Sequence, residues 1–453
     1  MKIIKNYIYY FFIFILIILL IVGFLINKKS SASKKNEISN LTLQIKTKNN
    51  QLSNIQKYFL ENGKNINDFV NPKNINFSKI LTDKKLKDLN NLSMSKYKTN
   101  DILFNGNFRA LASAYVDFYN DDNELILATK DGIFASTKIE SIKKFDKINS
   151  NIFELITYDD FYTHNQYGIK DILVYQDILF VSLIGQRQKN CHNFKILKSK
   201  ITKQNLNFEI FYETPGCVSK TNNHGYYAGQ GAGGRMFIKD DSLLFTTGEF
   251  RNRPLAQDKK NAYGKILSIN LNSKEAKIIS TGHRNPQGLY YSKKYDFIIS
   301  TEHGPKGGDE ININHEPSKK VRNYGWPISS YGEHYYKNHS KKILDEAPLN
   351  KSHKKYGFEE PVKYFVPSIG ISEIIPLNDI DTEFLIGAMG SEIVEQDLGL
   401  HYIKLNGDRK KIIKHKYITL NERVRDIVIS KNRDTVILFL ETSSSLGVIK
   451  KIK

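Results

Sequence analysis

Cysteine is almost absent from this sequence, and the spacing of the few that occur excludes the common zinc sites. The 453 residues include only Cys191 and Cys217, and no C-x-x-C pair is present. These two could form a disulfide in an oxidising compartment or remain two core thiols, and the sequence leaves both open. Tryptophan is scarce as well. The single one, Trp326, lies in a Gly-Pro turn, where packing is its usual role.

A nucleic-acid recognition motif is also missing, although the formal net charge is +20. A basic chain can indicate binding to nucleic acid or to an anionic membrane surface. Here the positive charge is mostly lysine, spread evenly and interleaved with asparagine and isoleucine. That distribution is typical of compositional bias rather than of a binding stripe, so we expect no nucleic-acid partner.

One long apolar run is present, near the amino terminus. Tyr7 to Ile26 is a stretch of twenty residues without charge, which matches the ~20 residues that a helix needs to span a bilayer. We predict a signal anchor over residues 1–29, and cleavage near the small residues 30–32 is the alternative. More lysines follow the run than precede it, which by the positive-inside rule alone would keep the rest of the chain in the cytoplasm.

Residues 30–103 are rich in Asn, Lys and Ser and are predicted to form a polar, partly helical spacer. Within it, apolar residues recur at alternating spacings of 3 and 4, which is a short heptad pattern. The apolar positions are Ile38, Leu41, Ile45, Leu52, Ile55 and Phe59. A juxtamembrane coiled coil and a single amphipathic helix on the main domain both account for this pattern.

A repeating unit sets residues 104–453 apart from the spacer. Each unit has polar turn residues, then a short apolar strand, then small or polar residues. The six instances begin at Asp121, Tyr175, Lys239, Lys293, Asn378 and Lys431. No long amphipathic helix interrupts them. Recurring short strands of this kind indicate an all-β fold, and six related units favour a six-bladed β-propeller over two sandwiches.

Four loops between these units carry residues suited to chemistry. They are "TGHRNPQGLYY" from Thr281, "STEHGPKGGDEIN" from Ser300, "RNYGWP" from Arg322 and "NERVRDI" from Asn421. The second ends a strand in Gly-Pro and Gly-Gly pairs followed by two carboxylates, which suits a ligand held by main-chain oxygens. In the fourth, two arginines alternate along a strand and therefore face one side, where they would suit a polycarboxylate.

In this order, "GHRNPQGL", "TEHGPKGGDEIN", "NYGWP" and "RVRDI" resemble the soluble dehydrogenases of the glucose/sorbosone and aldose sugar type that depend on pyrroloquinoline quinone (PQQ). The resemblance covers roughly residues 104–450. It implies a six-bladed propeller, an exported location, and a quinone bound with calcium over the central channel. The quinone carries the redox chemistry of such an enzyme, and protein groups position and polarise it.

The resemblance also implies roles for residues around the quinone. Arg284 and Asn285 match the pair that lies beside it, and Arg284 would polarise a quinone oxygen. Arg423 and Arg425 match arginines that face its carboxylates. Gln166, in "HNQYGIKDI", matches a glutamine that lines the sugar site.

Calcium ligands follow from the same resemblance. Gly304 and Pro305 match residues whose carbonyls hold the calcium of the cofactor. Asp309 and Glu310, with Tyr324, resemble a second, structural calcium site, for which a salt-bridged turn is the alternative reading.

The sequence departs from the family at the catalytic centre. The general base of the family is a histidine four residues before a Gly-Arg-hydrophobic turn, and that position is Gly231 in "GQGAGGRM". Glycine cannot accept a proton. His224 could substitute if its loop folds inward, and a surface histidine is the bland reading. A lysine that some members place near the quinone is also missing from "GAMGSEI", from Gly387.

These observations predict a PQQ- and calcium-dependent enzyme that oxidises an aldose sugar at C1 and passes electrons to a respiratory acceptor. The location expected is the inner membrane, with a single N-terminal pass and the propeller in the periplasm, because quinone chemistry of this type implies export. The alternative is a non-catalytic, membrane-anchored propeller that binds a quinone, a sugar or a protein partner, and Gly231 motivates it.

Overall fold

The computed structural model describes residues 74–86, 89–99, 113–156, 168–221, 229–335, 340–391 and 393–451. The chain divides into two compact units, Met1–Pro72 and Lys73–Lys453, and every described residue belongs to the second. The predicted anchor and heptad segment, together with Gln166 and His224, lie outside the described residues. No helix within those ranges combines the length and apolar character needed to cross a membrane.

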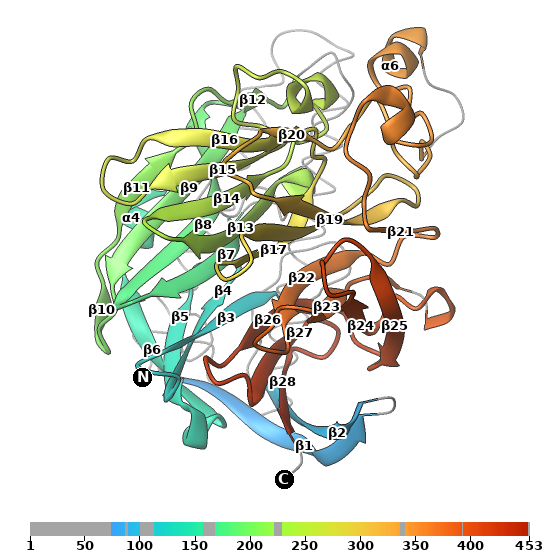
Figure 1. The fold of residues 1–453 in the computed structure, drawn as a ribbon. Helices are drawn as coiled ribbons and strands as arrows, with labels where there is room; N and C mark the ends of the chain where they lie inside the picture. The colour runs from blue at the N-terminus through green and yellow to red at the C-terminus, as the bar shows by residue number, and fades with distance from the viewer. Residues whose placement is uncertain are drawn as a thin grey trace, which may run out of the picture. The chain divides into compact units, whose positions relative to one another are not determined.

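The described strands form five sheets, one of ten strands, two of five and two of four, and these divide into six four-stranded antiparallel blades of a propeller (Figure 1). Blade 1 consists of β3 (Ala114–Tyr119), β4 (Glu124–Thr129), β5 (Phe134–Lys138) and β6 (Lys144–Ser150). Blade 2 consists of β7 (Gly168–Tyr175), β8 (Ile178–Gln188), β9 (Cys191–Lys200) and β11 (Glu209–Glu213). Blade 3 consists of β13 (Gly233–Lys239), β14 (Ser242–Thr247), β15 (Lys265–Asn270) and β16 (Ala276–Thr281).

Blades 4 to 6 consist of β17 (Pro286–Ser292), β18 (Phe297–Glu302), β19 (Asp309–His315) and β21 (Lys363–Phe365); β22 (Ile371–Pro376), β23 (Glu383–Ala388), β24 (Gly399–Leu405) and β25 (Ile412–Thr419); and β26 (Val424–Ile429), β27 (Thr435–Leu440), β28 (Ser445–Lys451) and β2 (Leu89–Thr99). Minor strands are β10 (Asn205–Leu206), β12 (Val218–Ser219) and β20 (Arg322–Asn323), and short α-helices are α4 (Ile152–Leu155) and α6 (Lys341–Glu346).

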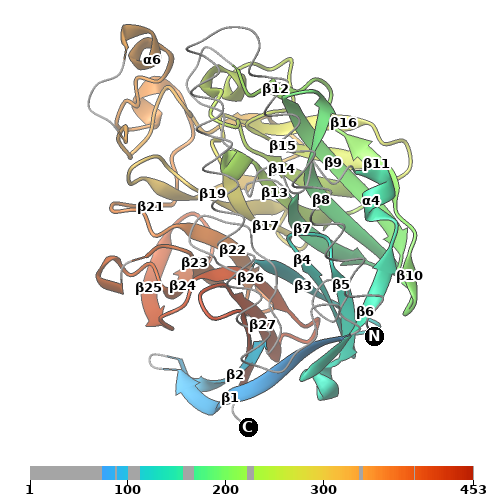
Figure 2. The same ribbon diagram turned by 180° about the vertical axis from the view of Figure 1, so that it is seen from behind.

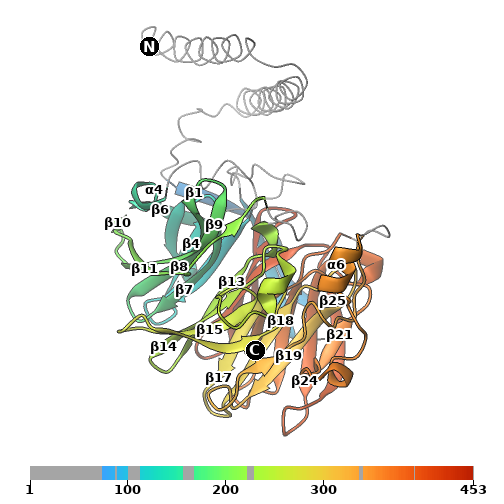
Figure 3. The same cartoon turned by 90° about the horizontal axis from the view of Figure 1, so that it is seen from above.

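The innermost strands close into a ring, which confirms the propeller expectation. Each of β3, β7, β13, β17, β22 and β26 lies against the next, and β26 lies against β3. Figure 2 shows the sheets following one another in chain order around this ring, and Figure 3 shows neighbouring sheets from the side. Each of the six repeated sequence units is the turn into the second strand of a blade, together with that strand. In "ELILAT" of β4 every residue is buried, because blades cover both faces of an inner strand.

The amino-terminal side of the described chain differs from the sequence prediction. Residues 74–86 and 89–99, assigned above to the spacer, are strands of the propeller. β2 pairs with β28 as the outer strand of blade 6, and β1 (Asn74–Leu86) joins β2 to β6 of blade 1. These strands look polar in sequence because they lie at the outer rim of the propeller, where few of the described side chains are buried. Ile75 and Phe77 are among the buried ones.

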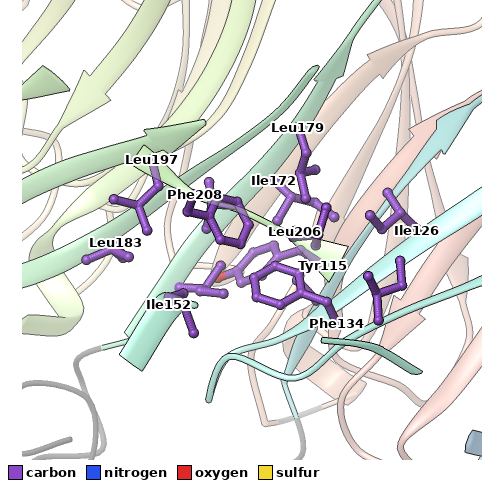
Figure 4. Packing of buried hydrophobic residues seen from close by; sticks show 14 of the residues in the cluster. Tyr115, Ile126, Phe134, Ile152, Ile172, Leu179, Leu183, Leu197, Leu206 and Phe208 are labelled. Carbon is purple, nitrogen blue, oxygen red and sulfur yellow. The ribbon is translucent and has the colours of Figure 1, made fainter. Parts of the chain in front are cut away.

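The apolar core lies between blades rather than in one central mass. Figure 4 shows the cluster between blades 1 and 2, in which residues from several strands and from α4 interdigitate. Phe134 and Phe208 are tilted against each other with ring centroids 5.1 Å apart. Such layered packing holds neighbouring blades at a fixed angle, and so fixes where the first residues of each innermost strand lie.

A disulfide joins Cys191 and Cys217, so the structure settles the alternative that the sequence left open. Their Cα atoms are 5.4 Å apart, and the bond ties the start of β9 to the segment that leads into β12, across a sequence separation of 26. No free cysteine remains in the described chain. Structural disulfides persist in oxidising compartments and are rare in the cytosol.

We expect the double variant Cys191→Ser, Cys217→Ser to have a free energy of unfolding lower by about 3 kcal/mol, because the cross-link restricts the unfolded chain over a loop of this size. Urea denaturation followed by tryptophan fluorescence measures it. Reductant should lower the stability of the wild type to that of the variant and leave the variant unchanged. Equal stability of the two oxidised proteins would contradict the expectation.

Candidate active site

The innermost strands all begin at one end of the ring, and this end carries the predicted site. Arg235, near the start of β13, reaches residues near the starts of four other innermost strands. The guanidinium also lies over the ring of Tyr115 from β3, 5.2 Å from its centroid. One side chain therefore contacts all six blades, and we call it the arginine hub.

Three carboxylates surround the hub. The guanidinium pairs with Asp171 at 2.9 Å, Glu373 at 2.9 Å and Asp426 at 2.6 Å, and it donates to the carbonyls of Gln287 and Arg425, each at 2.8 Å. The three acids lie close enough to hold a metal ion. The guanidinium is the cation among them, so the geometry is that of a buried ion cluster rather than of a metal centre.

The second oxygen of each carboxylate bonds to the backbone of an adjacent blade. Asp171 accepts from the N–H of Met236, Asp426 from Val116 and Glu373 from Leu289. Burial raises the pKa of Glu373 to about 7, against the opposing effect of Arg235. Burial likewise raises the pKa of Asp171 well above its ordinary value, again opposed by Arg235. Both carboxyl groups therefore keep a proton up to a higher pH than such acids do in water.

Arg423 and Arg425 flank Val424 at the start of β26, where the Arg425 carbonyl bonds the hub, and their side chains face one side, as their alternation predicts. The Nε atoms of both bond to the buried carboxylate of Glu441, at 3.1 Å and 2.5 Å. Burial raises the pKa of Glu441, but Arg425 and Arg423 outweigh it, so that pKa lies below its ordinary value. Arg423 also donates to the carbonyls of Met389 and Gly390. Both arginines are thus held rigidly and remain partly exposed.

Two lysines that sequence reasoning missed lie near these arginines. Burial lowers the pKa of Lys170, on β7, to about 7, and the neighbouring Lys130 and Arg425 lower it further. Lys130, which follows β4, also has a lowered pKa, from burial first. The two arginines keep their charge in this region, where Glu441 pairs with both of them and Asp131 neighbours Lys130. Such a region attracts an anionic ligand.

Arg284 and Asn285 are fixed just before β17. The Arg284 guanidinium donates to the carbonyl of His303 at 2.9 Å and lies 5.4 Å from the ring of Trp326. Asn285 Oδ1 accepts from the N–H of Gly233 at 2.8 Å and from the side chain of Gln287. Burial lowers the pKa of His303 to about 4. Asp309 opposes this, and the charges of Arg284, Arg425 and Arg423 reinforce it.

The loop from His303 to Asp309 is tight. Gly308 has a φ of 74°, and a Cβ there would lie 2.3 Å from the nitrogen of Gly332, so glycine is required. Asp309 Oδ1 accepts from the N–H of Gly304 at 3.0 Å. The carboxylate also accepts from Ser368, Ile369 and Ile371.

The second calcium site predicted from Asp309, Glu310 and Tyr324 finds no support in this geometry. Asp309 holds the loop, as just described. Glu310 accepts from His353 at 3.0 Å, and the Tyr324 hydroxyl donates to the carbonyl of Ile313 at 3.1 Å. Adjacent residues of one strand also face opposite sides. The three side chains therefore do not point their oxygens at one cation, and the alternative of a bonded turn fits better. The roles predicted for Gly304 and Pro305 concern carbonyls and stay predictions.

Gly231 lies in a short 3₁₀ turn, Gly229–Gly231, immediately before β13. The atom nearest to a Cβ built there is the Cα of Phe250, 4.0 Å away. The place predicted for a base therefore has no side chain, and no atom of the described residues lies closer than this to an added Cβ. Sequence reasoning missed a buried acid, Glu249, in the segment whose backbone bonds to Gly231. The signal that the sequence offers for this acid is a carboxylate two residues after the buried strand β14.

The sequence is similar to those of known dehydrogenases. The family model described as Glucose / Sorbosone dehydrogenase matches residues 115–450. The aldose sugar dehydrogenase YliI of Escherichia coli (strain K12) is 27% identical over 321 residues, which cover 65% of this chain and 79% of that protein. The uncharacterized protein slr1608 of Synechocystis sp. is 28% identical over 253 residues, or 50% of this chain, and this chain spans 55% of its length.

Solved structures match over most of the chain. A crystal structure of a glucose dehydrogenase superposes with a TM-score of 0.60 at 21% identity, covering 78% of this chain and 99% of that one. The apo form of the soluble aldose sugar dehydrogenase from Escherichia coli gives 0.60 at 20% identity, covering 79% and 100%. At these identities the likeness establishes the fold.

Proposed function

The chain belongs to the glucose/sorbosone dehydrogenase family, and from this premise we propose that it is a PQQ- and calcium-dependent enzyme that oxidises an aldose sugar at C1. Electrons would then pass to a respiratory acceptor. The observation that carries the proposal is the pair of arginines that Glu441 fixes where the innermost strands begin, Arg423 and Arg425, with Lys130 and Arg284 near them.

The donor set fits the proposed cofactor. PQQ is an anionic polycarboxylate, and arginines fixed by Glu441 offer charge-assisted hydrogen bonds without having to be ordered on binding. Arg284 would bind an oxygen of the quinone, and the carbonyls of Gly304 and Pro305 would hold its calcium, a hard cation that takes main-chain oxygens. When bound, the quinone supplies the hydride acceptor. The protein supplies binding, orientation and a place for the sugar proton.

The disulfide supports an exported location for the propeller. Together with the apolar run Tyr7–Ile26, it favours an inner-membrane protein with one N-terminal pass and a periplasmic propeller. A reporter fused after Lys453 tests this proposal. Activity of a reporter that works only in the cytoplasm would contradict it.

A second candidate function is favoured by Gly231. A propeller without the family's base could bind a quinone, a sugar or a protein without turnover. The test uses the full chain purified in detergent, with calcium and PQQ, and follows dye reduction across a panel of aldoses. Turnover supports the enzyme. Quinone binding without turnover favours the binding protein, and no quinone binding would contradict both the cofactor and the reaction.

Arg425 offers a direct check on the cofactor. We expect Arg425→Met to weaken PQQ binding by about 10- to 100-fold, because a hydrogen bond from a charged group contributes about 1.5–3 kcal/mol. Quenching of intrinsic fluorescence measures the dissociation constant. Arg187→Met, which changes an exposed arginine on β8, is the matched control and should bind normally. Equal affinities of the two variants would show that Arg425 does not face the quinone.

A further inference from the structure

Glu249 is a buried acid beside the candidate site. It follows β14, is 1% exposed, and its Oε2 atom has no hydrogen-bond partner within the described part of the chain. Its own N–H donates to the carbonyl of Arg284 at 3.1 Å. An unbonded carboxylate oxygen in the interior costs free energy, and such groups cluster where function requires them. This oxygen therefore needs an explanation.

The charges around Glu249 come from three elements. Burial raises the pKa of Glu249 to about 7. Arg284, before β17, and Arg253, in the 3₁₀ turn Arg253–Ala256, lower this pKa, as does a hydrogen bond from the N–H of Arg251. Glu302, at the end of β18, raises it. Arg284 is the cation with the largest effect. The acid is thus electrostatically coupled to the arginine that is predicted to polarise the quinone.

The segment that carries Glu249 is paired with the position of the missing base. The N–H of Phe250 donates to the carbonyl of Gly231 at 3.1 Å, and that of Gly248 donates to Ala232. The free space at the α-carbon of Gly231 ends at the Cα of Phe250, the residue next to Glu249. Glu249 is therefore bonded through its N–H to Arg284 and is followed in the chain by the residue that lies against position 231, so the acid and the arginine are both anchored next to that position.

We propose that Glu249 is the general base of this protein, in the role that a side chain at position 231 would otherwise have. This inference rests on the proposed function. In the step, the O–H bond at C1 of the sugar breaks and its proton goes to Glu249 Oε2. The C1–H bond breaks with its electron pair going to the quinone, and a C=O bond forms. The sugar is oxidised and the quinone is reduced.

The test compares Glu249→Gln, which keeps the shape and removes the base, with the wild type. We expect kcat/KM to fall by about 10²–10⁴-fold while PQQ affinity stays within threefold. In the wild type, kcat/KM should rise with pH through about 7, because the carboxylate must be ionised, and this limb should vanish in the variant. Glu275→Gln, in an exposed turn, is the matched control and should behave as wild type.

A second measurement, the pH dependence of stability, needs no cofactor. The pKa of Glu249 is raised by folding, so its contribution to stability is present below the unfolded value of about 4.5 and is lost as pH rises through about 7. The stability of apo Glu249→Gln relative to wild type should therefore increase between pH 5 and pH 8. Glu249→Asp keeps a carboxylate and should keep the pH limb at a reduced rate.

Three results would overturn the proposal. Retention of the limb in Glu249→Gln together with its loss in Lys170→Met would assign the proton to Lys170 instead. Loss of PQQ binding in Glu249→Gln would show that the acid only positions Arg284. An unchanged pH dependence of apo stability would show that Glu249 does not titrate in this range. Failure of the wild type to bind PQQ is a separate outcome, which contradicts the proposed function itself.

Discussion

Replacing Arg235 by methionine is expected to lower the free energy of unfolding by about 3–5 kcal/mol, because it removes the one cation among three buried carboxylates. The lost contacts to the carbonyls of Gln287 and Arg425 add to this cost. Urea denaturation, with the midpoint and slope fitted together, measures the effect. Arg187→Met, an exposed arginine, is the control and should change stability little.

The loss should depend on pH in a defined direction. Without Arg235, the pKa values of Asp171 and Glu373 rise further, so the folded variant holds protons that the unfolded chain releases. Its stability should therefore fall as pH rises from 5 to 8, more steeply than that of the wild type. Adding Asp426→Asn removes one of the unpaired charges and should recover part of the loss. A loss below about 1 kcal/mol would show that the hub does not hold the ring together.

Introducing Gly231→His into the Glu249→Gln variant is expected to restore kcat/KM by about 10²–10⁴-fold, the usual range for a positioned general base. The backbone at Gly231 has no positive φ, and among the described residues the atom nearest to a new Cβ is 4.0 Å away, so a Cβ is accommodated there. In the wild-type background the same substitution should change the rate little, because Glu249 already accepts the proton.

The pH profile separates rescue from a nonspecific effect. The rescued enzyme should show a limb near the ordinary histidine pKa of about 6.5, shifted from that of the wild type. Gly231→Gln adds a side chain of similar size without a base and is the matched control, which should not rescue. A large gain from Gly231→His in the wild-type background would mean that no base was present there, and a failure to rescue Glu249→Gln would indicate a structural role for the acid.

Much of the fold could be predicted from the sequence, for a local reason. Each blade's second strand is buried on both faces, so its apolar run stands out after a polar turn, and six such runs predict six blades. β1 and β2 were missed because outer strands bury few side chains. The shared face of Arg423 and Arg425 followed from two-residue periodicity, which any strand obeys.

The site could be predicted only where a motif is contiguous. The acidic partners of Arg235 are Asp171, Glu373 and Asp426, which lie on three different blades, and only closure of the ring brings them together. Asp309 looked like a metal ligand because sequence does not reveal the N–H groups that occupy it. Lys130 and Lys170 were hidden by a lysine-rich composition, in which no single lysine stands out. Cys191 and Cys217 gave no signal for or against pairing.

The strand that completes blade 6 has a consequence for biogenesis. β2 is synthesised before any blade, and its partner β28 is made only after five blades are complete. Until then β2 presents an unpaired edge, which is open to wrong partners, and the closing contact must overcome the entropy of a very long loop. Completion of the ring therefore reports that the whole propeller has been synthesised, and a chain truncated within blade 6 would keep an open edge for chaperones and proteases to recognise.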